Sequence, residues 1–253
     1  MLDRRQRFCI SLATAVAFTA SSILAVASTS VESKALVAAT RPVPVEGVTI
    51  DVAPVKVTTK TFDRKTPPAE MPPLKPGEAA VAESNFSCRT VTSVVVLKQN
   101  QGGSANGGAN GTCAATVQVE KMSVTLGLEV VIWLPKGGPR KLTRHEEGHQ
   151  KISEHFYALA EPIITALTAE QIGKTYSADA ATCDAAINAA ISEAGNLVCQ
   201  QYMAKVQMPS ANVQERYDEL TDHGRNRLRE DEAIRKAIEE EAAISSVPTS
   251  SRS

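Results

Sequence analysis

Aromatic side chains are scarce in this sequence. Phe, Trp and Tyr together make up 4% of the 253 residues, and there is a single Trp. Aromatic residues are frequent anchors of binding pockets and interfaces. Their scarcity leaves few obvious anchors for a substrate-specificity pocket, and this feature points to a non-enzymatic protein as an alternative to an enzyme.

The N-terminal segment is too weakly apolar for a membrane span, because Ala, Ser and Thr interrupt it throughout. Arg4, Arg5 and Arg7 precede a stretch of apolar and small residues at 8–24, and a small-residue cleavage site follows at 25–27. This order is typical of a secretory signal peptide. We predict a signal peptide over 1–27, export to the periplasm or the extracellular space, and no membrane span after cleavage.

An excess of positive charge is also missing. The whole chain has a formal net charge of −1, and removal of residues 1–27 leaves 24 basic and 27 acidic residues, a net charge of −3. Nucleic acids and anionic membranes attract basic proteins. The charge balance therefore argues against a nucleic-acid partner and against an anionic-membrane partner.

Cysteine is infrequent but even in number after the signal segment. The four that remain are Cys88, Cys113, Cys183 and Cys199. An even number in an exported chain predicts one or two disulfides, with three pairings possible. On a continuous helix, Cys183 and Cys199 lie about 24 Å apart and each must pair elsewhere, since a disulfide needs Cα atoms within about 7 Å. A helix break at Gly195-Asn196 would remove this restriction.

Prolines are concentrated near the N-terminus. Eight of the thirteen lie between Pro42 and Pro76, and such segments favour extended, polyproline-like chain. We predict a proline-rich linker over 28–80, mostly extended or disordered, in which a short strand at 48–57 is possible.

The remaining chain divides into a folded domain over 81–224 and a tail over 225–253. The tail is rich in charge and has helical character. We predict a charged helical tail that is partly disordered and solvated.

Strands precede helices in the predicted domain. Residues 90–99 have strand character, and the glycine-rich loop that follows lacks the spacing of a phosphate-binding loop. Apolar residues occupy every even position from 122 to 134, which predicts a strand with one face on a core. That strand could bind an extended substrate by strand addition, although a purely structural sheet is equally compatible.

The apolar spacing changes to three and four residues from position 140, which predicts a helix over 140–160. Another helix is predicted over about 179–207. We therefore expect an α+β fold in which a small antiparallel sheet packs on the 140–160 helix, with further helices.

Three of the four histidines lie within this helix, and two of them fit the pattern H-E-x-x-H. His145 and His149 are four residues apart, so both face one side of a helix and can reach one zinc ion at about 2.0–2.1 Å. Glu146 can then act as general base on a metal-activated water, while Glu147 is rotated away. Both histidines also lie on the apolar stripe, where an unpaired ring is unfavourable. We predict one Zn²⁺ ion here.

The third metal ligand is not fixed by this helix. His155 lies about 100° around the helix from the pair and about 9 Å beyond His149, so we expect it to be an exposed helix histidine. His223 is favoured as the third ligand, because no structural role explains a His-Gly pair at that helix end. The carboxylates that remain as alternatives are Glu161, Glu170, Glu193 and Asp222. Tyr217 could donate to an oxyanion, but a packed tyrosine is the commoner case.

Several motifs together resemble a bacterial family of uncharacterised proteins regarded as secreted zinc-dependent proteases. They are the signal peptide, FSC (86–88), Leu134-Pro135, RHEEGH (144–149), TCDAA (182–186) and YDELTDHG (217–224). The resemblance spans roughly 86–224 and implies zincin-type metallopeptidase activity, with His223 as a site residue. Relatives tend to continue with Gln-Gly after the position of Gly224, whereas this chain has Arg225-Asn226-Arg227.

The sequence thus predicts a secreted or periplasmic zinc metallopeptidase with a peptide or protein substrate. His145, His149 and His223 would hold the ion, Glu146 would be the general base, and Tyr217 is a weaker catalytic candidate. The main alternative is an inactive zincin-like envelope protein with a structural zinc or a partner-binding role. A helical interaction protein without metal is the third possibility.

Overall fold

The computed structural model describes residues 45–101 and 112–245. The strands are β1 (Val48–Val52), β2 (Lys56–Phe62), β3 (Val81–Gln101), β4 (Cys113–Pro135) and β5 (Thr175–Ala180). The helices are α1 (Arg140–Ala158), α2 (Ala160–Ala169), α3 (Cys183–Tyr202), a π-helical turn at Met203–Gln207, α4 (Met208–Thr221) and α5 (Glu230–Ser245). The fold is therefore mixed α+β, as expected. The predicted signal peptide and residues 28–44 lie outside the described part.

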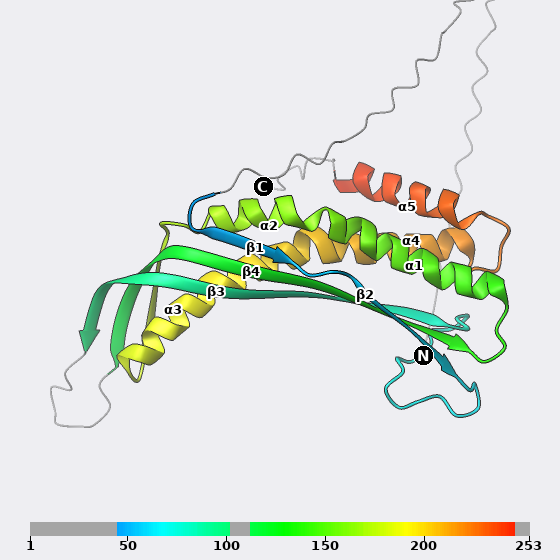
Figure 1. Cartoon of the computed structure of the whole chain (residues 1–253), viewed down its shortest axis with the longest axis horizontal. Helices are drawn as coiled ribbons and strands as arrows, with labels where there is room; N and C mark the ends of the chain where they lie inside the picture. The colour runs from blue at the N-terminus through cyan, green and yellow to red at the C-terminus, as the bar shows by residue number, and fades with distance from the viewer. Residues whose placement is uncertain (1–44, 102–111, 246–253) are drawn as a thin grey trace, which may run out of the picture. The chain divides into compact units, whose positions relative to one another are not determined.

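All five strands form one sheet around β4 (Figure 1). β3 pairs with β4 antiparallel along one side, while β5, β1 and β2 share the other side. β1 and β2 run parallel to β4, so the sheet is mixed rather than purely antiparallel. Because β4 pairs with β3 on one side and with β1 at 122–126 and β2 at 129–135 on the other, it offers no long free edge for strand addition by a substrate. The sheet acts there as core.

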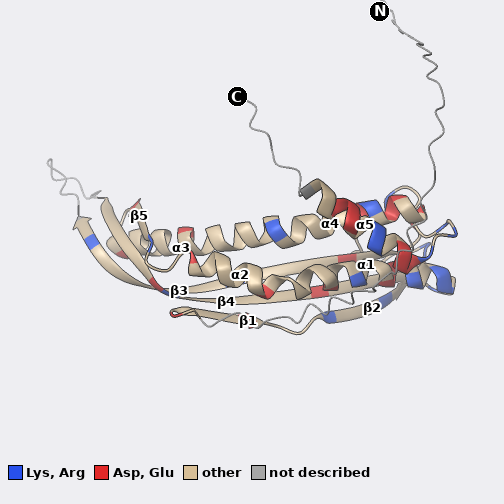
Figure 2. Cartoon of the chain, turned by 90° about the horizontal axis from the view of Figure 1, so that it is seen from above, with Lys and Arg blue, Asp and Glu red and all other residues tan. Residues whose placement is uncertain are grey.

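The alternation expected at 122–134 is present. Met122, Val124, Leu126, Leu128, Val130 and Ile132 are all buried. These side chains pack against one layer of helices formed by α1, α2 and α3 (Figures 1 and 2). Burial of this apolar surface is the main source of stability for the sheet–helix packing.

A second, smaller core joins the C-terminal helices to α1. Ile152 of α1 packs there with Val213 and Tyr217 of α4 and with Ala233 and Ala237 of α5. The predicted tail is therefore helical over Glu230–Ser245, but two of its alanines are fully buried rather than solvated. This core fixes α4 beside α1.

Two disulfides join the sheet to α3. Cys88 of β3 bonds Cys199, and Cys113 of β4 bonds Cys183. The helix is continuous from Cys183 to Tyr202, so the inference that each helix cysteine pairs with a strand cysteine is confirmed. Among the described residues no helix is long and apolar enough to cross a membrane. Both observations are compatible with an exported protein.

The proline-rich segment differs from the expected linker. Residues 48–52 and 56–62 are strands of the sheet, whereas the sequence suggested one short strand at most. Residues 63–80 then form a crossover from β2 on one side of β4 to β3 on the other side. Pairing with β4, which lies far along the chain, supplies the backbone hydrogen bonds that a local reading could not foresee.

Helix boundaries agree well except near residue 179. The helix predicted over 140–160 is α1, and it ends at the turn before Pro162. The helix predicted to begin near 179 begins instead at Cys183, because residues 175–180 pair with β4 and Thr182 caps α3 by accepting from the Ala185 N–H.

Candidate metal centre

α1 positions the two histidines of the H-E-x-x-H pattern. The chain leaves β4 through a turn at residues 136–138, and Pro139 precedes the first helical residue. One helical turn separates His145 from His149, and both side chains point toward α4, where their Nε2 atoms lie 3.3 Å apart. The two residues are only 3% and 6% exposed. Two imidazole nitrogens are therefore held at one buried point.

α4 brings a carboxylate to the same point. Asp218 Oδ1 lies 3.1 Å from His145 Nε2 and 3.0 Å from His149 Nε2. The three atoms thus form a triangle with edges of 3.0, 3.1 and 3.3 Å. Two ligands of a tetrahedral zinc, each at about 2.0–2.1 Å, lie about 3.3–3.4 Å apart. The triangle therefore has nearly the dimensions of one face of a zinc coordination sphere.

Hydrogen bonding fixes the His149 ring. Nδ1 faces Gln214 Oε1 at 2.5 Å, while Gln214 Nε2 donates to Ser153 Oγ at 2.9 Å. Ser153 Oγ donates to the His149 carbonyl at 3.2 Å, which leaves it free to accept from Gln214. A donor at Nδ1 places the lone pair of a neutral His149 on Nε2. The ring is thus in the tautomer that a metal ligand requires.

The lone pair of His149 Nε2 faces an acceptor oxygen of Asp218, which is repulsive unless a cation or a proton lies between them. Without a metal, the charge of Asp218 favours a proton on the His149 ring. Burial lowers the pKa of His149, but the hydrogen bond and the charge of Asp218 outweigh burial and raise it above its usual value. Burial likewise acts to raise the pKa of Asp218, yet hydrogen bonds from His145 and His149 hold it well below its usual value. The pocket is built to hold positive charge.

Glu146 lies beside this triangle and is 3% exposed. Burial raises its pKa from 4.5 to about 7, with smaller raising effects from Asp218 and Glu78; the charge of His149 and the Ala82 backbone N–H lower it. A carboxylate whose pKa lies near neutrality can both accept and return a proton. Glu147, the neighbouring acid, is exposed on the other side of α1.

Tyr217 packs behind the histidines. Its ring stacks on His145, with 5.0 Å between centroids and 13° between planes, and it meets His149 edge-on at 5.0 Å. Its hydroxyl donates to the His145 carbonyl at 3.3 Å, and the residue is 0% exposed. The oxyanion role considered for Tyr217 has no support in this geometry. We describe it as a residue that positions the two rings.

His223 lies on the turn that ends α4. Asp222, His223 and Gly224 all have positive φ angles, of 50°, 51° and 74°. This turn brings His223 Nδ1 to 3.6 Å from Asp218 Oδ1. A Cβ on Gly224 would lie 2.9 Å from His145 Cγ, so glycine is needed both for the φ angle and for the close approach. The His-Gly pair does lie at the site.

His223 belongs to a second group of possible ligands. Its ligand atom lies within 4.8 Å of those of Glu78 and Asp218, while Asp218 also belongs to the group with His145 and His149. The choice of His223 as third ligand therefore stays a prediction. Asp218 was not among the ligands predicted from the sequence, although it lies inside YDELTDHG and the structure places it in both groups. The sequence signal would have been an acidic residue on the face of α4 that packs against α1.

The other candidates lie differently. The Asp222 carboxylate pairs with the Arg225 guanidinium at 2.7 Å. Among the described residues, Glu161, Glu170 and Glu193 belong to no group of side chains that could hold an ion. His155 is exposed, as expected, with its ring edge-on to Phe156.

A cavity of about 360 Å³ opens beside the triangle, and we call it the metal-site cavity. One wall is the start of β3 at residues 80–84, and another is the crossover through Pro72, Pro73 and Glu78. Its ionisable lining besides the two histidines consists of Lys75 and five acids: Glu78, Glu83, Glu146, Glu215 and Asp218. The cavity therefore favours cations and disfavours acidic ligands.

Comparisons of the chain with protein-family models, with curated proteins and with solved structures find no match. The geometry of the site must therefore carry the functional argument by itself.

Proposed function

We propose that this protein is an exported zinc-dependent metallopeptidase. The observation that carries the proposal is the triangle of His145 Nε2, His149 Nε2 and Asp218 Oδ1, with edges of 3.0–3.3 Å, beside a buried Glu146 whose pKa is about 7. A set of two imidazoles and one carboxylate suits zinc and is one of the ligand sets of zinc hydrolases. The two disulfides fit the export predicted from the N-terminal segment.

Three residues would hold the ion in this proposal: His145, His149 and Asp218. His223 is the residue next in line, because it lies 3.6 Å from the same Asp218 oxygen. When bound, a zinc ion supplies Lewis-acid chemistry that polarises a peptide carbonyl and makes water more acidic.

Glu146 carries the proton in the proposed reaction. Its carboxylate accepts a proton from the attacking water and passes it to the departing amine, so the base is regenerated as the C–N bond breaks. The Ala82 backbone N–H favours the ionised form of this carboxylate. Gln214 keeps His149 in the ligand tautomer throughout.

The second candidate is a zinc-stabilised scaffold with no catalysis. It is favoured by the burial of the site, since His145 and Glu146 are each only 3% exposed and structural zinc sites are closed. The scarcity of aromatic anchors points the same way. The two candidates bind the same metal at the same residues but differ in what Glu146 does.

Hydrolysis of a fluorogenic peptide mixture separates the candidates. The chain purified after export, loaded with one equivalent of zinc, is compared with Glu146→Gln and with Glu147→Gln as the matched exposed control. We expect hydrolysis by the wild type and by Glu147→Gln, and a loss of kcat of about 10²–10⁴-fold in Glu146→Gln. Bound zinc with no hydrolysis would leave the scaffold as the function. Equal hydrolysis by all three proteins would show that Glu146 is not the general base.

A further inference from the structure

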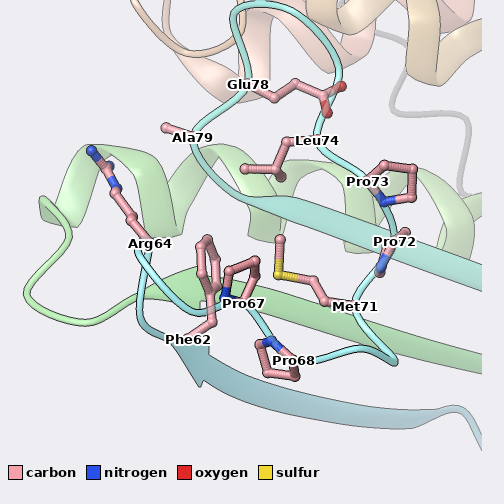
Figure 3. A pocket seen from close by; sticks show the side chains of 10 residues that line it. All are labelled: Phe62, Arg64, Pro67, Pro68, Met71, Pro72, Pro73, Leu74, Glu78 and Ala79. Atoms are coloured by element: carbon pink, nitrogen blue, oxygen red, sulfur yellow. The ribbon is translucent and has the colours of Figure 1, made fainter.

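The crossover between β2 and β3 encloses a second cavity (Figure 3). It measures about 400 Å³, within the range of about 300–1,000 Å³ that small-molecule pockets occupy. Most of its lining is apolar, as in Phe62, Pro67, Pro68, Met71, Pro72 and Leu74. We call it the crossover pocket.

The side chains of the crossover pocket are arranged around an apolar centre. Phe62 is 2% exposed and lies at the base, while Met71 and Leu74 are half-buried. Figure 3 shows Phe62, Met71 and Leu74 gathered toward one another, with the charged ends of Arg64 and Glu78 at the border. A concave apolar surface left open to water is a typical feature of a ligand site.

Prolines form much of the wall. Pro67 and Pro68 lie on one part of the crossover, and Pro72 and Pro73 on another. Because each proline ring fixes its own φ angle, such a wall loses little conformational freedom when a ligand enters. The pocket is thus shaped before a ligand binds.

The crossover pocket adjoins the metal-site cavity. Pro72, Pro73 and Glu78 line both cavities. The two cavities are therefore close neighbours on the same segment of the crossover. The metal-site cavity is lined by many charged groups, whereas the crossover pocket has only Arg64 and Glu78, both at its border.

We infer that the crossover pocket is the subsite for a long apolar side chain of the peptide whose scissile bond lies at His145, His149 and Asp218. The inference rests on the proposed function for the position of that bond. Substrates are then peptides with Leu, Met or Phe near the cleaved bond and without acidic residues, which the carboxylates of the metal-site cavity would repel. Prolines, Met71 and Leu74 complete the apolar surface around Phe62, the one aromatic residue in the lining of the pocket.

The test uses a peptide series in which one position at a time is Ala, norvaline, Leu or Phe, with no acidic residue. We expect kcat/KM to rise at least about 10-fold from Ala to Leu at one position, since a single methylene in an apolar pocket changes it by about 10–200-fold. In Met71→Glu and in Leu74→Glu this preference falls to near unity. Met71→Leu, of similar volume, and Val91→Glu, on an exposed part of β3, keep it.

A binding measurement separates failure of the pocket from failure of the peptidase. The zinc-loaded single variant Glu146→Gln is titrated with the same peptides. The double variant Glu146→Gln, Met71→Glu is titrated in the same way. Hydrolysis by the wild type without a preference for apolar residues, or with a preference that Met71→Glu and Leu74→Glu leave intact, overturns the pocket. Binding that prefers Leu over Ala and is lost with Met71→Glu, without hydrolysis by the wild type, overturns the peptidase and supports the pocket. If the peptides are neither bound nor hydrolysed, both the pocket and the peptidase proposals are overturned.

Discussion

Gly148 and Tyr217 approach each other so closely that a Cβ on Gly148 would lie 2.2 Å from the Tyr217 hydroxyl oxygen. This contact explains why a glycine separates Glu147 from His149 in RHEEGH. It also sets the distance between α1 and α4, on which the meeting of the histidines with Asp218 depends.

The substitution Gly148→Ala should therefore disturb the metal site by displacing Tyr217 and α4. The added methyl group forces α4 away from α1, and overpacking of this kind costs typically about 1–3 kcal/mol. We expect a lower free energy of unfolding, measured in guanidinium chloride, together with weaker zinc binding. Glu147→Ala, on the exposed side of the same turn, is the control, and equal zinc affinity in the two variants would contradict the proposed role of the contact.

The hydrogen bond from His149 to Gln214 gives a second prediction. Loss of a partner that orients a ligating histidine typically costs 10–100-fold in metal affinity. We expect Gln214→Leu to lower zinc affinity by about this factor, measured by competition with a chelator. Asn212→Ala, on the exposed side of α4, should leave it unchanged. A Gln214→Leu protein with wild-type affinity would show that Gln214 does not set the tautomer of His149.

Asp218 and His223 can be distinguished as ligands. Asp218→Asn keeps the shape of the side chain but removes its charge, so we expect zinc affinity to fall by more than about 100-fold, beyond the range for an orienting residue. For His223→Ala we expect a loss of about 10-fold or less. A larger loss in His223→Ala than in Asp218→Asn would establish His223 as the third ligand, as the sequence first suggested.

The stability of the metal-free protein should fall as the pH rises from about 4.5 to 7. Because the pKa of Glu146 is raised from 4.5 to about 7, the folded state in this window holds a proton that the unfolded state has released, which makes the slope negative. The change corresponds to at most about 3 kcal/mol. The raised pKa of His149 acts in the same direction, since its stabilising proton is lost as the pH rises through it.

Unfolding in guanidinium chloride with a chelator present, at several pH values, measures this slope. Glu146→Gln should flatten it and be more stable than the wild type at pH 7, whereas Glu147→Gln should follow the wild type. A wild-type stability that is constant or rises between pH 4.5 and 7 would contradict the burial argument for Glu146.

The sequence predicted the helical parts of the site better than the parts supplied by loops and strands. His145, Glu146 and His149 could be placed together because helix geometry relates residues four apart without knowledge of the fold. Asp218 could not, because its contact with α1 depends on how α4 packs through Tyr217 and Gly148. Gly148 was visible in the motif, but the residue that requires a glycine there is Tyr217, about seventy residues later.

The proline-rich segment was the largest departure from expectation. Proline density indicated extended chain correctly at the level of the backbone, yet the strands at 48–52 and 56–62 pair with a strand more than sixty residues later. Long-range pairing leaves no local pattern beyond apolar alternation, which is present in the short β1 but weak in β2. The crossover pocket follows from that pairing and was equally hidden.

Among the described residues, β4 is the only strand with which each of the other four strands pairs. In the part of the chain that the structure describes, the order of folding follows from this arrangement. The antiparallel pair of β3 and β4 is close in sequence and can form early, whereas β1 and β2 must wait for β4 before they gain a partner, and such distant pairings form slowly. The crossover between β2 and β3 is thus drawn into place late, so a newly made chain would have its histidine helix before it had its apolar pocket.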